Sequence, residues 1–244
     1  RAWLLERFQP PFDELGFEVE NSKGEWGPGQ EELNLAHQEP VEMADRHCIF
    51  KHGVKEVAAL QGLSVTFMAK WHTNNAGNSF HLHSSIWDRN TGNPRGWDPR
   101  GPAHISSRLR QWVAGQLALG RELSVFYAPY VNSYRRYQAG SFAPTRLVAG
   151  VDNRTCGMRI LGHSANGIRV ENRCPGADAN PYLAFAATIA AGLYGMENKL
   201  EMEDLYTGNA YADPTVPEVP KTLYEAIGLL DRSKAARAAF GDTV

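Results

Sequence analysis

The sequence predicts an α+β fold, with one core built from both helices and strands. Residues 39–61 and 104–120 show the apolar spacing of amphipathic helices. Residues 63–70 and 169–173 show the apolar content or the alternation that is typical of strands. A chain of 244 residues is long enough to bury one sizeable core.

The first half of the chain predicts helices and strands separated by polar turns. Pro40 lies near the start of one helix, where proline is favoured in the first turn. In chain order we predict a helix and then a strand over 1–20, a helix over 39–61, a strand over 63–70, polar turns over 71–79, a strand over 81–88 and a loop over 90–102.

The second half predicts mostly helix around one stretch of strand and loop. Asn180 and Pro181 resemble a helix start, with an acceptor side chain followed by proline. We predict a helix over 104–120, strand and loop over 131–163, a helix from about 178 to 199, a loop over 203–217 and two short helices over 219–239 that break near Ser233.

Composition excludes several classes of protein. The formal net charge of −2 gives no electrostatic reason to expect a nucleic-acid partner. No run of 18 apolar residues indicates a membrane span. Three scattered cysteines form no disulfide framework, so we expect reduced thiols in a cytoplasmic protein.

Two histidines stand two residues apart behind a glycine-bearing turn. On a strand, His81 and His83 would face the same side and project into one site. Imidazole binds divalent metals and hydrogen-bonds phosphate. Taken alone, such a pair is more often two half-exposed strand histidines.

Carboxylates and arginines shift that balance towards a site. Glu25 and Glu32 flank a Gly-Pro-Gly bend that can fold them towards one point. Arg169, Glu171 and Arg173 would share one strand face, which cannot be buried unless these charges meet a metal, an anion or one another. Each group alone is more often a solvated face. Together they supply the side chains needed to bind divalent cations and a polyphosphate.

Five blocks of residues, in order from about residue 16 to the end, resemble the catalytic domain of the glutamine synthetase family. They are Glu25-x4-Gln30-x-Glu32, Gly77-x3-His81-x-His83-x-Ser85, residues 132–136, Asp152-Asn153-Arg154-x4-Arg159, and Arg169-Val170-Glu171-x-Arg173 with residues 179–185. The resemblance implies a curved, mainly antiparallel sheet with outer helices and the site in its mouth.

The resemblance also implies roles for individual residues. The expected ligands of two or three Mg²⁺ or Mn²⁺ ions are Glu25 and Glu32 for one ion and His81 and Glu171 for another. The expected ATP contacts are His83, Ser85, Arg159 and Arg169. The expected glutamate contacts are Gly77, Arg136 and Arg173, and Arg136 and Arg154 are expected to be catalytic, Arg154 as a phosphate contact.

The implied activity is that of an ATP-dependent ligase. The γ-carboxylate of glutamate would attack the terminal phosphate of ATP, and ammonia or an amine would then displace phosphate from γ-glutamyl phosphate. The family also implies a homo-oligomer, typically a dodecamer of two stacked hexameric rings, with each active site completed by a neighbouring subunit.

Phe142 departs from the pattern of ammonia-using members, which carry a glutamate six residues after the arginine equivalent to Arg136. A phenyl ring cannot accept a proton from ammonium, and it makes the amine pocket apolar. We therefore favour an organic amine. A shifted backbone with another carboxylate serving ammonia, as in glutamine synthetase proper, is the alternative, and the sequence does not name the amine.

Family members also carry an N-terminal β-grasp domain and a Glu-x-Glu strand that gives each cation a further ligand. Neither motif precedes Glu25, so residues 1–244 are expected to be a truncated catalytic domain with weak metal binding and no turnover by itself. A non-catalytic structural or regulatory family member and a two-metal phosphohydrolase are the other readings. The retained ligands argue against the first, and the arginines expected to bind an amino acid argue against the second.

Overall fold

The strands of the computed structural model, which describes residues 14 and 16–242, form two sheets. In the small sheet, β1 (Val19–Gly24) pairs antiparallel with β2 (Glu31–Leu35). The larger sheet has the order β3-β6-β5-β4, with β3 at Leu82–Ser84, β6 at Arg169–Asn172, β5 at Cys156–Leu161 and β4 at Arg146–Val151. Its β3–β6 and β5–β6 pairs are antiparallel and β4–β5 is parallel. This arrangement confirms the α+β class and the largely antiparallel pairing.

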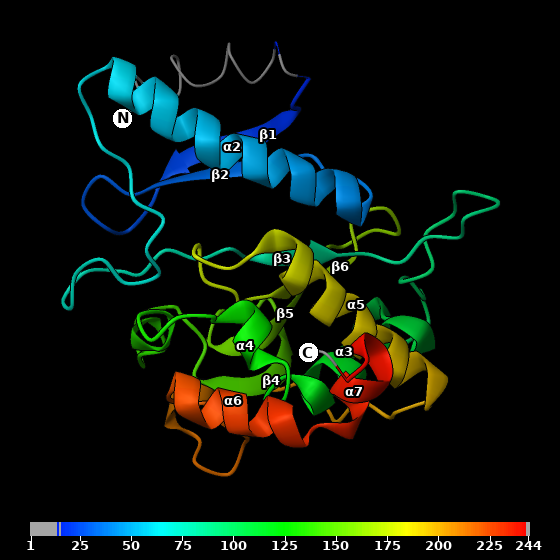
Figure 1. Cartoon of the computed structure of the whole chain (residues 1–244). Coiled ribbons are helices and arrows are strands. Elements are labelled where there is room, and N and C mark those ends of the chain that lie inside the picture. Colours follow the sequence, from blue (N-terminus) through cyan, green and yellow to red (C-terminus); the bar gives the residue numbers. More distant parts are fainter. Residues whose placement is uncertain (1–13, 15, 243–244) are drawn as a thin grey trace.

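Helices cover the two sheets separately (Figure 1). Helix α2 (Pro40–Leu60) lies along the small sheet, and Lys51 Nζ fixes it to the carbonyl of Ala177 at 2.7 Å. The remaining helices lie around the larger sheet. They are α3 (Ser107–Leu119), α4 (Ser124–Tyr127), α5 (Pro181–Glu197), α6 (Leu223–Arg232) and α7 (Lys234–Phe240), with 3₁₀ turns at Pro102–His104, Ser133–Arg136 and Ala210–Ala212.

The packing of α3 against α5 depends on glycine. A Cβ atom on Gly115 would lie 1.9 Å from the carbonyl oxygen of Ala191, and one on Gly195 would lie 2.1 Å from that of Gln111. The two backbones can approach this closely only because no side chain separates them. The contact anchors the core beside the larger sheet, where Leu109, Val113 and Met158 are buried.

Most predicted helices are confirmed. Helix α2 matches 39–61, and α5 begins at Pro181 with the Asn180 side chain accepting from the amides of Tyr182 and Leu183. The break near Ser233 is also confirmed, because Ser233 ends α6 and its hydroxyl caps α7. The one-turn helix α4 was not predicted, because four residues are too few to show a helical period.

Two strand predictions need correction. Residues 63–70 form no strand and belong to no sheet of the described chain. Their side chains Val65 and Phe67 pack against the cluster around Val54, and the Asn132 side chain pairs with the backbone of Lys70 in place of a neighbouring strand. The predicted 81–88 strand shortens to Leu82–Ser84, because β6 offers only three register partners.

Other predictions lie partly outside the described residues or are confirmed with small changes. The helix predicted early in 1–20 falls mainly on residues that are not described, whereas the strand that follows is β1. The 104–120 helix begins at Ser107, after the Ser106 cap. No helix in the described part of the chain is long and apolar enough to cross a membrane, and the three cysteines are free.

Replacing Gly115 by alanine tests the close approach of α3 and α5. We expect Gly115→Ala to lower the free energy of unfolding by about 3 kcal/mol or more, because the new methyl group meets backbone that cannot move aside. The matched control is Gly228→Ala in α6, where the nearest atom is a flexible Arg232 nitrogen at 3.4 Å. That change should stabilise by up to about 1 kcal/mol. Urea denaturation measures both, and equal effects would contradict the packing argument.

Candidate active site

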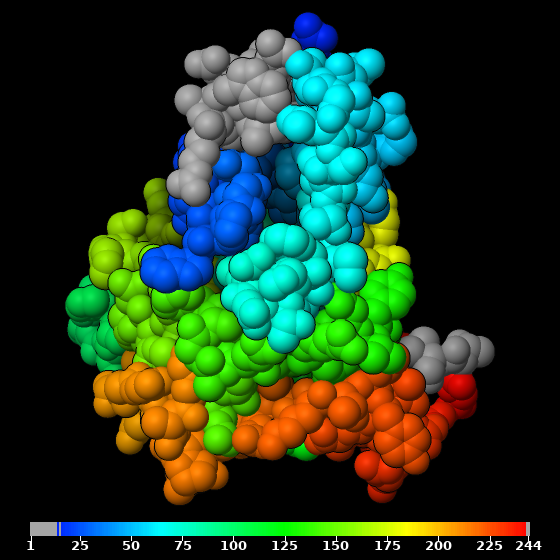
Figure 2. Space-filling view, turned by 90° about the vertical axis from the view of Figure 1, so that its left-hand side faces the viewer, coloured from blue at the N-terminus to red at the C-terminus, as the bar shows by residue number. Residues whose placement is uncertain are grey.

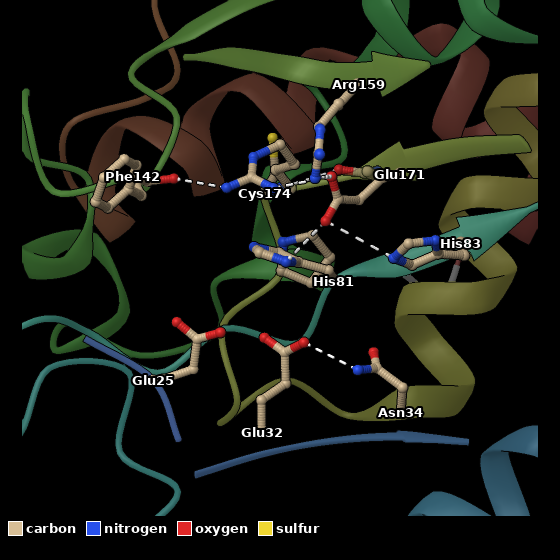
Figure 3. Close-up of polar contacts among 12 residues, drawn as sticks. Glu25, Glu32, Asn34, His81, His83, Phe142, Arg159, Glu171 and Cys174 are labelled. Carbon is tan, nitrogen blue, oxygen red and sulfur yellow. Dashed lines mark hydrogen bonds and ion pairs between the residues drawn. The ribbon is translucent and has the colours of Figure 1, made fainter. Parts of the chain in front are cut away.

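The centre of the candidate site is the buried carboxylate of Glu171 in the middle of β6 (Figure 3). Its register partners are His83 on β3 and Arg159 on β5, so three polar side chains form one row across the sheet. Glu171 Oε1 lies 3.0 Å from His81 Nδ1 and 3.7 Å from His83 Nε2. The predicted convergence of the two histidines is therefore confirmed, and a carboxylate is their meeting point.

Two arginines hold the other oxygen of Glu171. Arg173 Nη1 lies 2.8 Å and Arg159 Nη1 lies 3.1 Å from Oε2. The alternation of charges along 169–173 thus places Glu171 and Arg173 on one face, as predicted, and the charges are buried against one another.

Burial and these neighbours set the protonation states. Burial alone would raise the pKa of Glu171, but the His81 hydrogen bond and the charge of Arg173 hold that pKa well below its ordinary value. Burial lowers the pKa of His81 to about 4 and also lowers the pKa of His83. At neutral pH the site therefore presents an ionised carboxylate and neutral imidazoles, which are the forms that bind metal ions.

Arg136 lies behind this array and is only 2% exposed. Its Nη2 donates to the carbonyl oxygens of Arg173, Cys174 and Pro175 at 2.8, 3.2 and 2.7 Å. Its Nε and Nη1, and Nε of Arg173, are buried without an acceptor among the described residues. Buried guanidinium donors that lack acceptors fit the predicted role of binding a carboxylate substrate.

Gly77 is placed directly against Arg136. A Cβ atom on Gly77 would lie 2.7 Å from Cγ of Arg136, so only glycine leaves this backbone beside the guanidinium stem. The predicted glutamate contacts Gly77, Arg136 and Arg173 are thus brought together.

Of the predicted nucleotide contacts, His83 and Arg159 lie in the row and Arg169 adjoins it through His83, whereas the Ser85 hydroxyl bonds Trp87. Arg169 Nε donates to His83 Nδ1 at 3.0 Å, and Ser85 Oγ accepts from Trp87 Nε1 at 2.8 Å. Arg159 also pairs with Asp152. Arg154 stands apart in the turn between β4 and β5, exposed and without an ion pair or side-chain hydrogen bond in the described structure.

Glu25 and Glu32 face the Glu171 row from the small sheet (Figure 3). An ammonium group already joins them, because Lys23 Nζ lies 3.2 Å from Glu25 Oε1 and 3.1 Å from Glu32 Oε1. Lys23 is the register partner of Glu32 on β1. The bend therefore does bring the two carboxylates to one point, and a positive charge stands between them.

Gln30 connects the two halves of the site and was assigned no role from the sequence. Its Nε2 donates to the carbonyl of Gly77 at 2.9 Å and to Oδ1 of Asn78 at 2.8 Å. Figure 2 shows the blue β1–β2 segment against the cyan segment that precedes β3. The position of Gln30 in the Glu25-x4-Gln30-x-Glu32 block could have marked it as a site residue. Nothing in the sequence marked Lys23, because one lysine on a strand is ordinary.

The side chains fit a divalent cation in chemistry and spacing. Adjacent ligands of an octahedral ion with bonds of about 2.1 Å lie about 3 Å apart. The His81–Glu171 separation of 3.0 Å matches this, and the Glu25–Glu32 pair already accommodates a cationic group. The described residues nevertheless contain no cluster of three or more His, Cys, Asp or Glu side chains that could hold an ion. Each predicted pair would therefore supply two ligands to an ion.

The fold and the site define a member of the glutamine synthetase family. The family model for the glutamine synthetase catalytic domain matches residues 4–244, so the chain belongs to that family. Two solved GmaS structures share the fold. One is the ADP complex and the other has no ligand, each with a TM-score of 0.90, 28% identity and 99% coverage of this chain. The matches cover 57% and 56% of the GmaS chains.

Two curated relatives are similar along almost the whole chain. The gamma-glutamylethanolamide synthetase GlnA4 of Streptomyces coelicolor is 45% identical over 99% of this chain and 51% of its own length. The glutamate–isopropylamine ligase of a Pseudomonas species is 40% identical over 93% of this chain and 50% of its own length. The chain thus spans about half the length of these relatives.

The Glu171→Gln variant tests whether the charge cluster stabilises the fold. We expect it to lower the free energy of unfolding by about 3–5 kcal/mol, because it leaves buried Arg173 without its counter-charge. The control Asp152→Asn removes the other carboxylate partner of Arg159. The Asp152 side chain is 66% exposed, so this change should lower the free energy of unfolding by less than about 1 kcal/mol. Chemical denaturation measures both.

The Glu171→Gln variant also tests a pH dependence. Folding lowers the pKa of the Glu171 carboxyl from its ordinary value of 4.5, so this group stabilises the folded state fully above pH 4.5. The contribution is lost progressively as the pH falls below 4.5. Stability of the wild type should therefore fall more steeply than that of Glu171→Gln below pH 4.5. Parallel curves would contradict the assigned charge.

Lys23 is expected to compete with a cation for Glu25 and Glu32. Lys23→Met should lower the dissociation constant for Mn²⁺ by about two- to fivefold, in keeping with the small energy of a half-exposed ion pair. The control Lys221→Met removes a comparable pair with Glu218, far from the site in sequence, and should change nothing. Calorimetric titration measures the constant, and weaker Mn²⁺ binding by Lys23→Met would refute competition.

Proposed function

We propose that this chain is the catalytic domain of an ATP-dependent ligase that joins the γ-carboxylate of glutamate to an organic amine through γ-glutamyl phosphate. The observation that carries the proposal is the set of side chains around the Glu171 carboxylate. Two imidazoles, of His81 and His83, and two arginines, Arg159 and Arg173, surround this carboxylate, and Arg136 and Gly77 lie beside them.

In this proposal, the arginines bind the anionic groups of the substrates, and the carboxylates and His81 bind the cations. The free donors of Arg136 and Arg173 would hold glutamate carboxylates, and Arg154, Arg159 and Arg169 would face phosphate oxygens. Glu25 with Glu32, and His81 with Glu171, would hold Mg²⁺ or Mn²⁺. When bound, such ions offset phosphate charge and keep nucleophile and phosphorus in line. Orientation and charge compensation of this kind are the main requirements of phosphoryl transfer.

Phe142 supports an organic amine over ammonia. Phe142 lies beside the Arg173–Glu171 pair, because its backbone carbonyl accepts from Arg173 Nη2 at 3.0 Å (Figure 3). The residue next to this pair therefore carries an apolar ring and no carboxylate. The names of the two relatives, which refer to ethanolamide and isopropylamine, agree with this choice.

We propose that residues beyond those described complete the site: a Glu-x-Glu pair gives each cation its third ligand. We also propose that the protein assembles in the cytoplasm as a dodecamer of two hexameric rings. The two-ligand pairs support the first part. Light scattering on the full-length protein tests the second, and a stable monomer with full activity would refute it.

Phosphate release by the full-length protein tests the proposed function. The assay contains glutamate, MgATP and one amine from ammonium, methylamine, ethanolamine, putrescine or spermine, and reactions without glutamate are the control. We expect kcat/KM for one organic amine to exceed that for ammonium by at least about tenfold. Turnover with ammonium alone would make the protein a glutamine synthetase, and no glutamate-dependent release would support a non-catalytic role.

A further inference from the structure

The rings of Trp26 and Phe142 meet beside the candidate site although the residues are far apart in sequence. Their centroids are 6.1 Å apart with an interplanar angle of 70°. Trp26 lies in the turn between β1 and β2, and Phe142 lies in the loop before β4. Trp26 is 80% exposed and Phe142 46% exposed, so the pair presents open aromatic surface.

Both rings are held by backbone contacts of the site. Phe142 has a positive φ of 59°, and its carbonyl is fixed by Arg173 while the next carbonyl, of Ala143, accepts from the Tyr211 hydroxyl at 3.0 Å. A non-glycine residue keeps such a backbone only when its surroundings impose it. The backbone that carries the Phe142 ring is therefore held by the same arginine that binds Glu171.

The Trp26 turn is fixed in a similar way. The amide of Glu25 donates to the carbonyl of Gln30 at 2.8 Å, and the amide of Gly27 donates to Gln30 Oε1 at 3.0 Å. Gln30 in turn donates to the carbonyl of Gly77. The turn that carries Trp26 is thus bonded to Gly77, the glycine beside Arg136. In the sequence, Trp26 directly follows Glu25.

The two rings meet edge to face at 70° and form an open corner of apolar surface, because both remain largely exposed. Such a corner suits a small alkyl or hydroxyalkyl group, and aromatic faces attract an ammonium group. A single exposed aromatic residue is ordinary. Trp26 and Phe142 converge from separate turns. One follows Glu25 in sequence and the other is bonded to Arg173 through its carbonyl, so the pair is a specific arrangement.

We infer that Trp26 and Phe142 together form the wall of the amine site, and that Trp26 is a specificity-determining residue that selects primary amines with a short organic substituent. The inference rests on the proposed function and adds to it a second wall and the size of the amine. Long polyamines would extend past the corner and gain less from it than ethanolamine does.

Kinetics of the full-length protein test this inference. The variants are Trp26→Ala, the conservative Trp26→Phe, and the control Tyr224→Ala on α6, which removes a 90% exposed aromatic ring elsewhere. For each we would measure kcat/KM for ethanolamine, spermine and ammonium, and the KM for glutamate. Thermal unfolding shows whether each variant is folded, which the exposure of Trp26 favours.

We expect Trp26→Ala to lower the ratio of kcat/KM for ethanolamine to that for ammonium by about 10- to 100-fold, the usual worth of a small apolar contact in discrimination. The change should lie in the KM for ethanolamine, the loss for spermine should be smaller, and Trp26→Phe should recover most of the ratio. Tyr224→Ala should leave the ratio as in the wild type.

The outcomes separate the inference from the proposed function. If the wild type uses ethanolamine and Trp26→Ala keeps the wild-type ratio, the wall is wrong while the ligase activity stands. If Trp26→Ala raises the KM for glutamate as much as that for ethanolamine, Trp26 only supports the fold of the turn, and the inference fails. If the wild type uses ammonium alone, both the amine class and the wall are overturned.

Discussion

The buried carboxylate of Glu171 is the interaction on which the rest of the site depends. Strand β6 carries it into the interior, where an isolated charge would be costly. Four side chains compensate that cost, from His83 on β3, Arg159 on β5, His81 just before β3 and Arg173 just after β6. The sheet register then fixes the positions of His83 and Arg159 opposite it. One charge thus links the fold of the sheet to the arrangement of the proposed nucleotide and metal contacts.

The small sheet contributes the opposite side of the site through a few polar contacts. Gln30 ties the β1–β2 turn to Gly77 and Asn78, and Lys51 ties α2 to the carbonyl that precedes Asp178. Glu25, just after β1, and Glu32, on β2, consequently face the Glu171 row from the other sheet. Lys23 balances their charge, which stabilises two carboxylates at short range.

The loop at Phe142 joins catalysis to substrate choice in the proposed ligase. Arg173 uses one end of its guanidinium for Glu171 and the other for the Phe142 carbonyl. A change in the charge cluster would therefore disturb the loop that carries the ring of the proposed amine site. The strained backbone at Phe142 is consistent with a position that function maintains, because relaxed geometry would point the ring elsewhere.

The sequence by itself determined the helices α2, α5, α6 and α7 and the same-face placement of Glu171 and Arg173, because helical period, caps and strand alternation are local properties. It also carried the motifs that mark the family. Only the tertiary structure decided that residues 63–70 lack a partner strand, that Lys23 lies between two carboxylates, and that Trp26 meets Phe142. These features depend on contacts between distant residues, and no local pattern along the chain encodes which distant group will be the neighbour.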